Sequence, residues 1–244
     1  DMNETGALRD WMTRRRSLVH CTALLAWAVT GLSGTASVRN AFAAQAAAAT
    51  KVATPTSAAT TILVVGDSLS AEYGLQRGTG WVALLEKRLA AERIRAQVVN
   101  ASISGETTAG GRTRLPALLR ERKPDVVILE LGANDALRGL PLESTQANLA
   151  AMAHAAAQAG ARVLIVGMQV PPNYGRRYSD QFAALFATVA HAEGAALVPF
   201  MLKGVADAAH AEALFQPDRI HPLASAHPTI LANIWPTLRT LLPK

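Results

Sequence analysis

From Thr61 onward, short apolar runs alternate with longer segments of helical periodicity. Five runs rich in β-branched residues lie at Ile62–Val65, Gln97–Val99, Val126–Leu131, Arg162–Val166 and Ala196–Val198. Continuous apolar runs of this length are typical of parallel strands that are buried on both faces. The segments between them repeat apolar residues at helical spacing: Trp81, Leu84, Leu85 and Leu89; Leu149, Met152, Ala153 and Ala156; Phe182, Leu185, Phe186 and Val189; Ile230, Leu231, Ile234, Trp235 and Leu238.

Five strand-then-helix units predict an α/β fold of the flavodoxin-like kind, a three-layer α/β/α sandwich around a five-stranded parallel sheet. No internal repeat or second domain is visible, so we expect residues 61–244 to form one domain. Pro116 and Pro236 fall inside two of the helical segments. Since proline removes a helical hydrogen bond, we expect a kink or a restart of the helix at each of them.

The first 43 residues have the pattern of a removable export signal. Arg14 to Arg16 precede an apolar stretch from Leu18 to about Leu32, and the small residues Ala41 and Ala43 follow. The longest unbroken apolar run in it is Ala23–Val29, whereas a membrane span needs roughly 20 mostly apolar residues. We therefore expect a signal peptide over residues 1–43, no stable membrane anchor, and a periplasmic or secreted protein.

Two further features of this region bear on export. Thr13-Arg14-Arg15 suggests the twin-arginine route beside the general one, and the sequence leaves the choice open. Residues 44–60 are rich in Ala and Thr without usable periodicity, which predicts a linker between the signal and the fold.

Composition and charge narrow the function classes. The chain has 244 residues, 50% of them hydrophobic and 17% charged, which is ordinary for a globular protein. The first 43 residues hold five of the 24 basic residues and three of the 18 acidic ones, so the remainder carries a net charge of +4. Its Lys and Arg are scattered, which argues against a nucleic-acid partner. The single cysteine, Cys21, excludes an internal disulfide, a cysteine-rich zinc site and an iron–sulfur cluster.

Polar residues follow three of the predicted strands. Gly66 to Ser70 come after the first strand, Asn100 to Glu106 after the second, and Gly132 to Asp135 after the third. In open parallel sheets, ligands bind beyond the carboxyl ends of the strands. We therefore expect the Ser68 hydroxyl, a turn containing Gly105 and the Asn134 amide to converge at one edge of the sheet.

Asp218 and His221 lie three residues apart near the end of the chain, a spacing that lets both side chains meet on one side of a turn. Taken singly, these polar residues fit ordinary turns or helix caps, and Ser70 and Ser104 suit that description too. Taken together they predict nucleophilic catalysis, because a serine hydroxyl needs a neighbouring base and that base needs an orienting carboxylate.

The chain resembles the SGNH (GDSL) hydrolase family over nearly all of Thr61–Leu242, and within it the bacterial periplasmic thioesterase/lysophospholipase and arylesterase group. The stretches that carry the resemblance are Gly66–Ala71, Asn100–Gly105, Leu115–Leu119, Gly132–Asp135, Asn173–Tyr178 and Asp218–Pro222. They occur in the family's order and lie on the predicted turns. No Gly-x-Ser-x-Gly occurs, so the nucleophile elbow of the α/β-hydrolases is absent.

The resemblance implies serine hydrolysis with Ser68 as nucleophile, His221 as general base and Asp218 as the residue that orients His221. It implies an oxyanion hole made by the peptide N–H groups of Ser68 and Gly105 and the side-chain amide of Asn134. We expect Asp67 to brace the active-site turns rather than take part in the chemistry. No cofactor is expected, and no metal, because Asp218 and His221 have no third ligand at suitable spacing.

Substrate preference is a further expectation. An apolar segment after Asn134 contains Leu137 and Leu140, and Tyr174 follows the fourth strand, so we expect these three side chains to border an acyl group. The predicted substrates are esters or thioesters of acyl chains, including those at lipid surfaces. A carbohydrate deacetylase of the same family and a non-catalytic binding module are the alternatives. The oligomeric state stays open, with a monomer favoured.

Overall fold

A computed structural model gives the structure of the protein and describes residues 59–243. The expected signal peptide, residues 1–43, lies outside the described residues, as does most of the expected linker. Of that linker only Ala59 and Thr60 are described, and Thr60 already belongs to the first strand. The first strand therefore begins two residues before Ile62, where it was predicted to start.

The sheet has five strands, all parallel, in the order β2-β1-β3-β4-β5. They are β1 (Thr60–Gly66), β2 (Ala96–Asn100), β3 (Val126–Glu130), β4 (Arg162–Val166) and β5 (Ala196–Val198). In the centre of the sheet Leu63 of β1 lies between Val99 of β2 and Val127 of β3. The five-stranded parallel sheet predicted from the apolar runs is confirmed.

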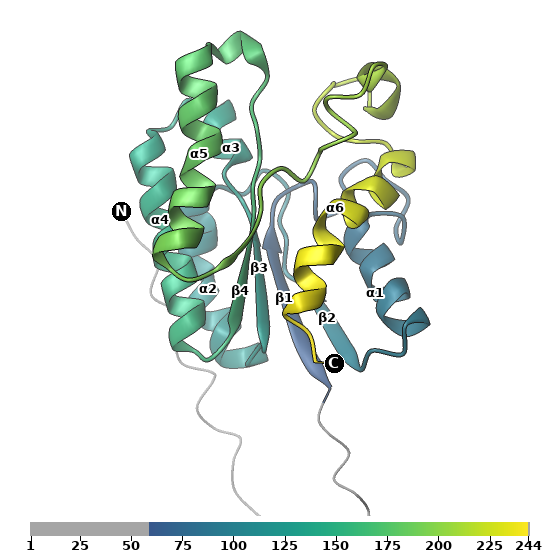
Figure 1. The fold of residues 1–244 in the computed structure, drawn as a ribbon, viewed down its shortest axis with the longest axis vertical. Helices are drawn as coiled ribbons and strands as arrows, with labels where there is room; N and C mark the ends of the chain where they lie inside the picture. The colour runs from purple at the N-terminus through teal and green to yellow at the C-terminus, as the bar shows by residue number, and fades with distance from the viewer. Residues whose placement is uncertain (1–58, 244) are drawn as a thin grey trace, which may run out of the picture. The chain divides into compact units, whose positions relative to one another are not determined.

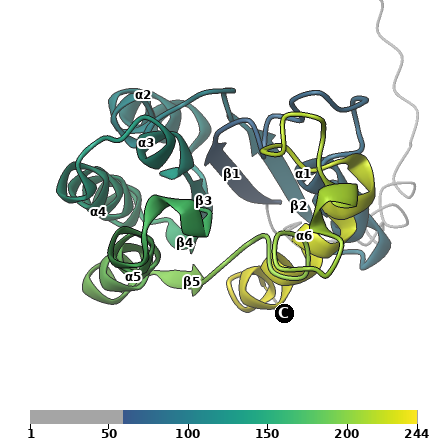
Figure 2. The same cartoon turned by 90° about the horizontal axis from the view of Figure 1, so that it is seen from above.

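Helices cover both faces of this sheet. They are α1 (Trp81–Ala91), α2 (Thr108–Arg122), α3 (Ala133–Leu137), α4 (Leu142–Gln158), α5 (Arg176–Ala192) and α6 (His227–Thr240), with short 3-10 turns η1 (Pro172–Tyr174), η2 (Ala211–Leu214) and η3 (Ala224–Ala226). Seen along the strands, α1 and α6 lie on one side of the sheet, while α2, α4 and α5 lie on the other (Figure 2). This is the predicted three-layer α/β/α sandwich.

The core lies on both faces of the central strands. Ile62–Val65 of β1 and Val126–Leu129 of β3 are fully buried, whereas the edge strand β2 is only half-buried. Helix α5 turns its predicted apolar face inward, and its Phe182 and Phe186 rings meet edge to face with centroids 5.2 Å apart. Both faces of these strands are buried, so their apolar residues are consecutive rather than alternating with polar ones.

The two internal prolines do not divide their helices. Pro116 lies within α2 and Pro236 within α6, and each helix is continuous across its proline. Of the two outcomes expected, a restart is therefore wrong. Helix α2 packs on α4 and β1, and α6 packs on α1 and β4. Because most helical stability in a protein comes from such packing, one missing hydrogen bond does not end the helix.

The strands all end at the same edge, which is at the top of Figure 1, and the loops after β1, β2, β3 and β4 leave the sheet there. The long connection between β5 and α6, residues 199–226, rises over the same edge (Figure 1). Among the residues that the structure describes, no helix combines the length and apolarity needed to cross a membrane.

Unequal burial of central and edge strands gives a stability prediction. Val64 of β1 is fully buried, whereas Val98 of β2 is half-buried. Val64→Ala should lower the free energy of unfolding by about 2–3 kcal/mol, because it removes buried methyl groups and leaves a cavity. Urea unfolding checks this, with Val98→Ala as the matched control. Equal losses in the two variants would contradict the assigned burial.

Candidate active site

Ser68 lies in a tight turn directly after β1. The peptide oxygen of Asp67 accepts from Ala71 N–H at 2.9 Å, and that of Ser68 accepts from Tyr73 N–H at 3.2 Å. The Asp67 side chain closes the turn by accepting from Leu69 N–H at 3.0 Å. The last residue of β1 is Gly66, where a larger residue does not fit, because an added Cβ would lie 2.7 Å from both Glu130 Oε2 and Ser70 Oγ. The turn therefore holds the Ser68 hydroxyl at the carboxyl edge of the sheet.

Asp218 and His221 lie on a loop that closes on itself. Gln216 N–H donates to the His221 carbonyl at 2.8 Å, and Phe215 and Pro222 form an antiparallel bridge. Asp218 Oδ1 accepts from the peptide N–H groups of Ile220 at 2.9 Å and His221 at 3.0 Å. Its other oxygen, Oδ2, lies 2.7 Å from His221 Nδ1. The pair is thus assembled within four consecutive residues.

Two hydrogen bonds join this loop to the Ser68 turn: Gln216 Nε2 donates to the Tyr73 carbonyl at 2.9 Å, and His221 contacts Ser68. His221 Nε2 lies 2.9 Å from Ser68 Oγ, across 153 residues of sequence. Because Nδ1 faces the Asp218 carboxylate, the proton of a neutral imidazole belongs on Nδ1, which leaves Nε2 free to accept from the serine hydroxyl. The structure therefore brings Ser68, His221 and Asp218 together in the order that proton transfer requires.

The electrostatics of the pair favour an ionised carboxylate. The pKa of the Asp218 carboxyl is lowered to about 2, chiefly by the hydrogen bond from the His221 peptide N–H, with Ile220 N–H and the imidazole adding to it. The Tyr73 ring lies against the imidazole, with centroids 4.4 Å apart and planes inclined at 39°. Asp218 is thus ionised at neutral pH and can hold the imidazole in one tautomer.

Asn134 and Gly105 stand on the two neighbouring loops. Asn134 belongs to the short helix α3, which follows Gly132 at φ 122°, and its Nδ2 donates to Asp67 Oδ2 at 3.0 Å. Gly105 has φ 77°, a left-handed conformation that favours glycine, and its carbonyl accepts from Arg138 Nη2 at 2.7 Å. Hydrogen bonds thus connect Asn134 to the Ser68 turn and Gly105 to the loop after Asn134.

The peptide N–H groups expected to form an oxyanion hole are available. Neither Ser68 N–H nor Gly105 N–H donates to another of the residues 59–243. Peptide N–H groups without a protein acceptor are the kind of donor that oxyanion holes use. The structure places a serine, a base and an orienting carboxylate in contact, and the oxyanion hole of Ser68, Gly105 and Asn134 stays a prediction.

Behind the Ser68 turn lies a buried polar network that the sequence analysis did not find. Ser70 Oγ donates to Glu130 Oε2 at 2.6 Å and accepts from Trp81 Nε1 at 3.1 Å. The peptide N–H of Trp81 donates to His227 Nδ1 at 3.0 Å, so His227 has a structural contact. The N-cap of α1 is Gly80, so Ser70 does not cap that helix. The signal was Glu130, an acidic residue inside an apolar run that was predicted to be a buried strand.

Two carboxyl groups share this buried region. Burial raises the pKa of Asp67 to about 6, against a tendency of the hydrogen bond from Leu69 to lower it. Burial, followed by the nearby charge of Asp67, raises the pKa of Glu130 well above its ordinary value. Burial thus disfavours the ionised form of both groups, and the charge of Asp67 adds to this effect on Glu130.

The three residues expected to border a substrate lie on loops of the same edge. Leu137 is 42% exposed and Leu140 37% exposed, both just beyond Asn134. Tyr174, in η1 after β4, is half-buried and stacks on Tyr178 with ring centroids 6.0 Å apart. The structure places all three at the carboxyl edge, and no contact joins any of them to Ser68.

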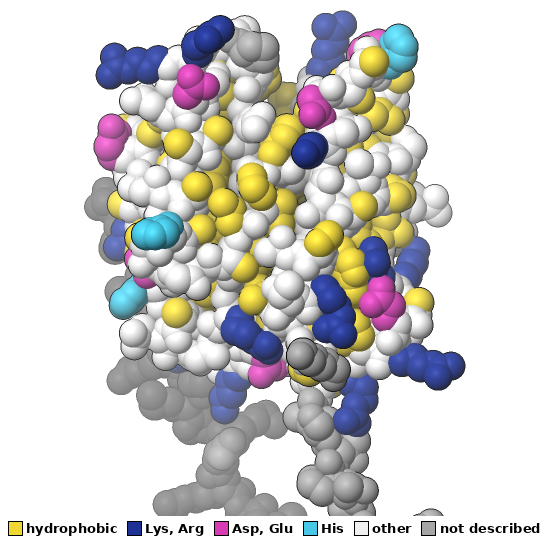
Figure 3. Space-filling view, viewed as in Figure 1, with side chains coloured by type: hydrophobic (Ala, Val, Ile, Leu, Met, Phe, Trp, Pro, Cys, Tyr) yellow, Lys and Arg dark blue, Asp and Glu magenta, His cyan; other side chains and the backbone are white. Residues whose placement is uncertain are grey.

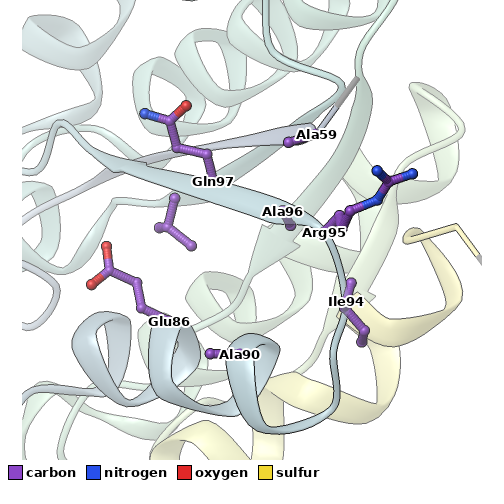
Figure 4. Close-up of a pocket in the computed structure, with 8 residues that line it drawn as sticks. Ala59, Glu86, Ala90, Ile94, Arg95, Ala96 and Gln97 are labelled. Atoms are coloured by element: carbon purple, nitrogen blue, oxygen red, sulfur yellow. The ribbon is translucent and has the colours of Figure 1, made fainter. Parts of the chain in front are cut away.

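Two other features lie outside this site. A shallow hollow at the opposite, amino edge of the sheet is lined by Ala59 and by residues of α1, of β2 and of the loop between them, among them Glu86, Ile94 and Gln97 (Figure 4). It contains no serine, histidine or cysteine. Within residues 59–243 no group of three His, Cys, Asp or Glu side chains is placed to hold a metal ion.

The fold and the contacts at its carboxyl edge define a class of hydrolase. The chain belongs to the GDSL-like lipase/acylhydrolase family, whose family model matches residues 64–228. The chain is 54% identical to esterase TesA of Pseudomonas aeruginosa over 189 residues, which is 78% of this chain and 92% of that protein. It is 39% identical to the thioesterase 1/protease 1/lysophospholipase L1 of Escherichia coli over 173 residues, 71% of this chain and 80% of that one.

Solved structures of esterases are similar to this chain as well. The crystal structure of TesA aligns with a TM-score of 0.72 at 54% identity and covers 75% of this chain and 99% of its own. The psychrotrophic esterase EstA from Pseudoalteromonas aligns with a TM-score of 0.69 at 40% identity and covers 74% and 97% of the two chains. Membership of the hydrolase family predicted from the sequence blocks is confirmed.

The buried carboxyl of Asp67 predicts a pH dependence of stability. Because its pKa is about 6 in the folded protein and 3.8 ordinarily, the folded state holds this proton more tightly than the unfolded state. The resulting stabilisation is complete below about pH 4 and is lost as the pH rises through about 6. Urea unfolding of the wild type should therefore show a fall in stability over this window, and Asp67→Asn should reduce the fall. Parallel pH profiles for the two proteins would contradict this.

Proposed function

We propose that this protein is a serine esterase that hydrolyses carboxylic esters and thioesters of acyl chains through an acyl-enzyme intermediate. The observation that carries the proposal is the uninterrupted contact from Ser68 Oγ to His221 Nε2 and from His221 Nδ1 to Asp218. A binding module has no use for a base placed against a serine hydroxyl. The family and the names of the relatives, esterase and thioesterase, support the same reaction.

The first half of the reaction follows from the contacts. As Ser68 Oγ forms a bond to the acyl carbonyl carbon, its proton passes to His221 Nε2, and the imidazolium is stabilised by the Asp218 carboxylate. The carbonyl oxygen becomes negative and is held by the N–H groups of Ser68 and Gly105 and by Asn134 Nδ2. When the tetrahedral intermediate collapses, His221 returns the proton to the departing alcohol or thiol, and the acyl group stays on Ser68.

The second half repeats these steps with water. A water molecule attacks the acyl-Ser68 carbonyl, His221 accepts one of its protons, and the same three donors hold the second oxyanion. Collapse releases the carboxylic acid and returns the proton to Ser68. The attack by Ser68 and the later attack by water each need a neutral imidazole to receive a proton, so the rate should fall in acid.

Apolar surface around the site supports acyl substrates. In residues 59–243 the large hydrophobic side chains with high exposure are Tyr73, Ile103, Leu137, Leu140, Ile220 and Leu223. All of them lie on the loops that carry Ser68, Gly105, Asn134 and His221. In Figure 3 the top of the molecule is hollowed between two raised parts, with hydrophobic side chains along the hollow. A carbohydrate deacetylase would instead call for a polar rim.

We also propose that the protein acts after export to the periplasm or the exterior. The support is the arginine-led apolar segment in residues 1–43 and the absence of cysteine from residues 44–244. An esterase in that compartment would meet lipids and other amphiphilic esters.

Ser68→Ala tests the reaction directly. Hydrolysis of p-nitrophenyl esters from acetyl to palmitoyl should include medium and long chains in the wild type, and kcat should fall by at least about 10⁴-fold in the variant, since nothing else receives the acyl group. Thr79→Ala, at an exposed hydroxyl away from the base, is the control. Activity confined to acetyl would favour the deacetylase, and activity independent of Ser68 would overturn the proposed mechanism.

Leu140→Asp tests the acyl site. A charge on this exposed apolar position should lower kcat/KM for long acyl chains about tenfold and leave acetyl turnover nearly unchanged, because only the long chain reaches it. Leu140→Met keeps the apolar surface and should behave like the wild type. An equal loss for both chain lengths would remove Leu140 from the acyl site.

A further inference from the structure

Asp67 has no step in the reaction just described, yet it is the buried charged side chain nearest to the nucleophile in sequence. It is 1% exposed and precedes Ser68 directly. Burying a carboxylate is unfavourable unless it is well hydrogen-bonded, and the raised pKa of Asp67 shows that this burial is incompletely compensated. A shorter or neutral residue would avoid that cost but would not make both hydrogen bonds that the carboxylate makes.

The two oxygens of Asp67 hold two different parts of the expected oxyanion hole. Oδ1 accepts from Leu69 N–H at 3.0 Å and so fixes the peptide units on both sides of Ser68, one of which carries the Ser68 N–H. Oδ2 accepts from Asn134 Nδ2 at 3.0 Å, across 67 residues. One rigid carboxylate therefore sets the distance between a donor on the β1 loop and a donor on the β3 loop.

The same contact selects the orientation of the Asn134 amide. An asparagine side chain can present either its NH₂ group or its oxygen to a neighbour. A carboxylate only accepts, so it keeps Nδ2 toward itself, and the second N–H of the same nitrogen remains for a substrate oxygen. The reversed amide would place Oδ1 near Asp67 and take Nδ2 away from the nucleophile.

The turn that contains Asp67 is itself held in place by further hydrogen bonds. Its own N–H points at Glu130 Oε2 at 3.4 Å, and that oxygen also accepts from Ser70 Oγ at 2.6 Å. Trp81 Nε1 donates to the same Ser70 hydroxyl. Asn100 Nδ2 donates to the Ser70 carbonyl at 2.8 Å, which ties the turn to β2.

We propose that Asp67 is a positioning residue of the oxyanion hole, which acts on the reaction rate by fixing the Asn134 amide relative to the Ser68 turn. This inference rests on the proposed function. It predicts that loss of the carboxylate lowers kcat and leaves KM nearly unchanged, because the oxyanion donors act on charge that develops only in the transition state.

A double-mutant cycle on p-nitrophenyl butyrate tests it. Asn134→Ala should lower kcat about 10²–10³-fold, the size found for removal of one oxyanion donor. Asp67→Asn should lower it about 10–100-fold, since Leu69 and Asn134 donate to different oxygens of Asp67 and an asparagine has an NH₂ group in place of one of them. In the Asn134→Ala background, Asp67→Asn should change kcat less than about twofold, because the group through which it acts is already gone.

Two further variants complete the experiment. Asp125→Asn is the matched control, since Asp125 also accepts a backbone N–H across the fold, that of Thr61 at 2.7 Å, at the amino edge of the sheet. Its kcat should equal that of the wild type. If Asp67→Asn does not fold by urea titration, Asp67→Ser takes its place in the cycle, because a serine hydroxyl can still accept from Leu69 N–H but is too short to reach Asn134.

The outcomes separate the two proposals. An equal kcat loss on changing Asp67 in the wild-type and in the Asn134→Ala backgrounds would mean that Asp67 does not act through Asn134 and would overturn this inference. Full activity in Asp67→Asn would do the same. If Ser68→Ala and Asn134→Ala both retain wild-type kcat, the proposed function itself fails.

Discussion

The hydrogen bond between Ser68 Oγ and His221 Nε2 joins loops that lie at opposite ends of the described chain. It exists because parallel strands deliver all their carboxyl ends to one edge, and because the connection after β5 reaches back over that edge. The nucleophile turn follows the central strand β1, which is buried on both faces. A serine on an edge strand or a frayed loop would have no such fixed position. The demand for a base within hydrogen-bond reach is thus met by the topology of the sheet.

Buried polar groups are concentrated where this precision is needed. Asp67, Ser70 and Glu130 are almost completely buried, and each contacts the turn that holds Ser68. Burial makes ionisation of the two carboxyl groups unfavourable and raises the pKa of both Asp67 and Glu130. An apolar replacement would fill the space at lower cost but could not orient an amide or a peptide N–H. Active sites commonly contain groups that lower the stability of the protein but hold the reacting groups in a fixed geometry.

Local patterns predicted most of the fold and the members of the site. Apolar runs predicted the strands, since strands buried on both faces have consecutive apolar residues. The spacing of Asp218 and His221 predicted a pair that the structure assembles within one loop. The link from Ser70 to Glu130 could not be predicted in the same way, because it joins residues 60 apart and depends on the register of β1 and β3. The continuity of helix α2 through Pro116 is also a tertiary effect, since packing on its neighbours decides it.

The site consists of two bodies, each held by its own hydrogen bonds. They meet where Ser68 Oγ contacts His221 Nε2, where the Tyr73 ring lies against the imidazole, and where Gln216 Nε2 donates to the Tyr73 carbonyl. One is the Asp218–His221 loop, in which both carboxylate oxygens of Asp218 form hydrogen bonds with residues 220 and 221. The other is the Ser68 turn with Asn134, held together by Asp67. Because neither body depends on the other for its own geometry, damage to one should leave the other formed. Asp67 ties Asn134 to the Ser68 turn, so under the proposed mechanism a small displacement of the histidine loop would alter proton transfer more than the position of the Asn134 amide relative to Ser68. Such a separation would suit a serine esterase with apolar residues around its site, since acyl groups of different length could shift the surrounding loops while Asn134 stays beside the Ser68 turn.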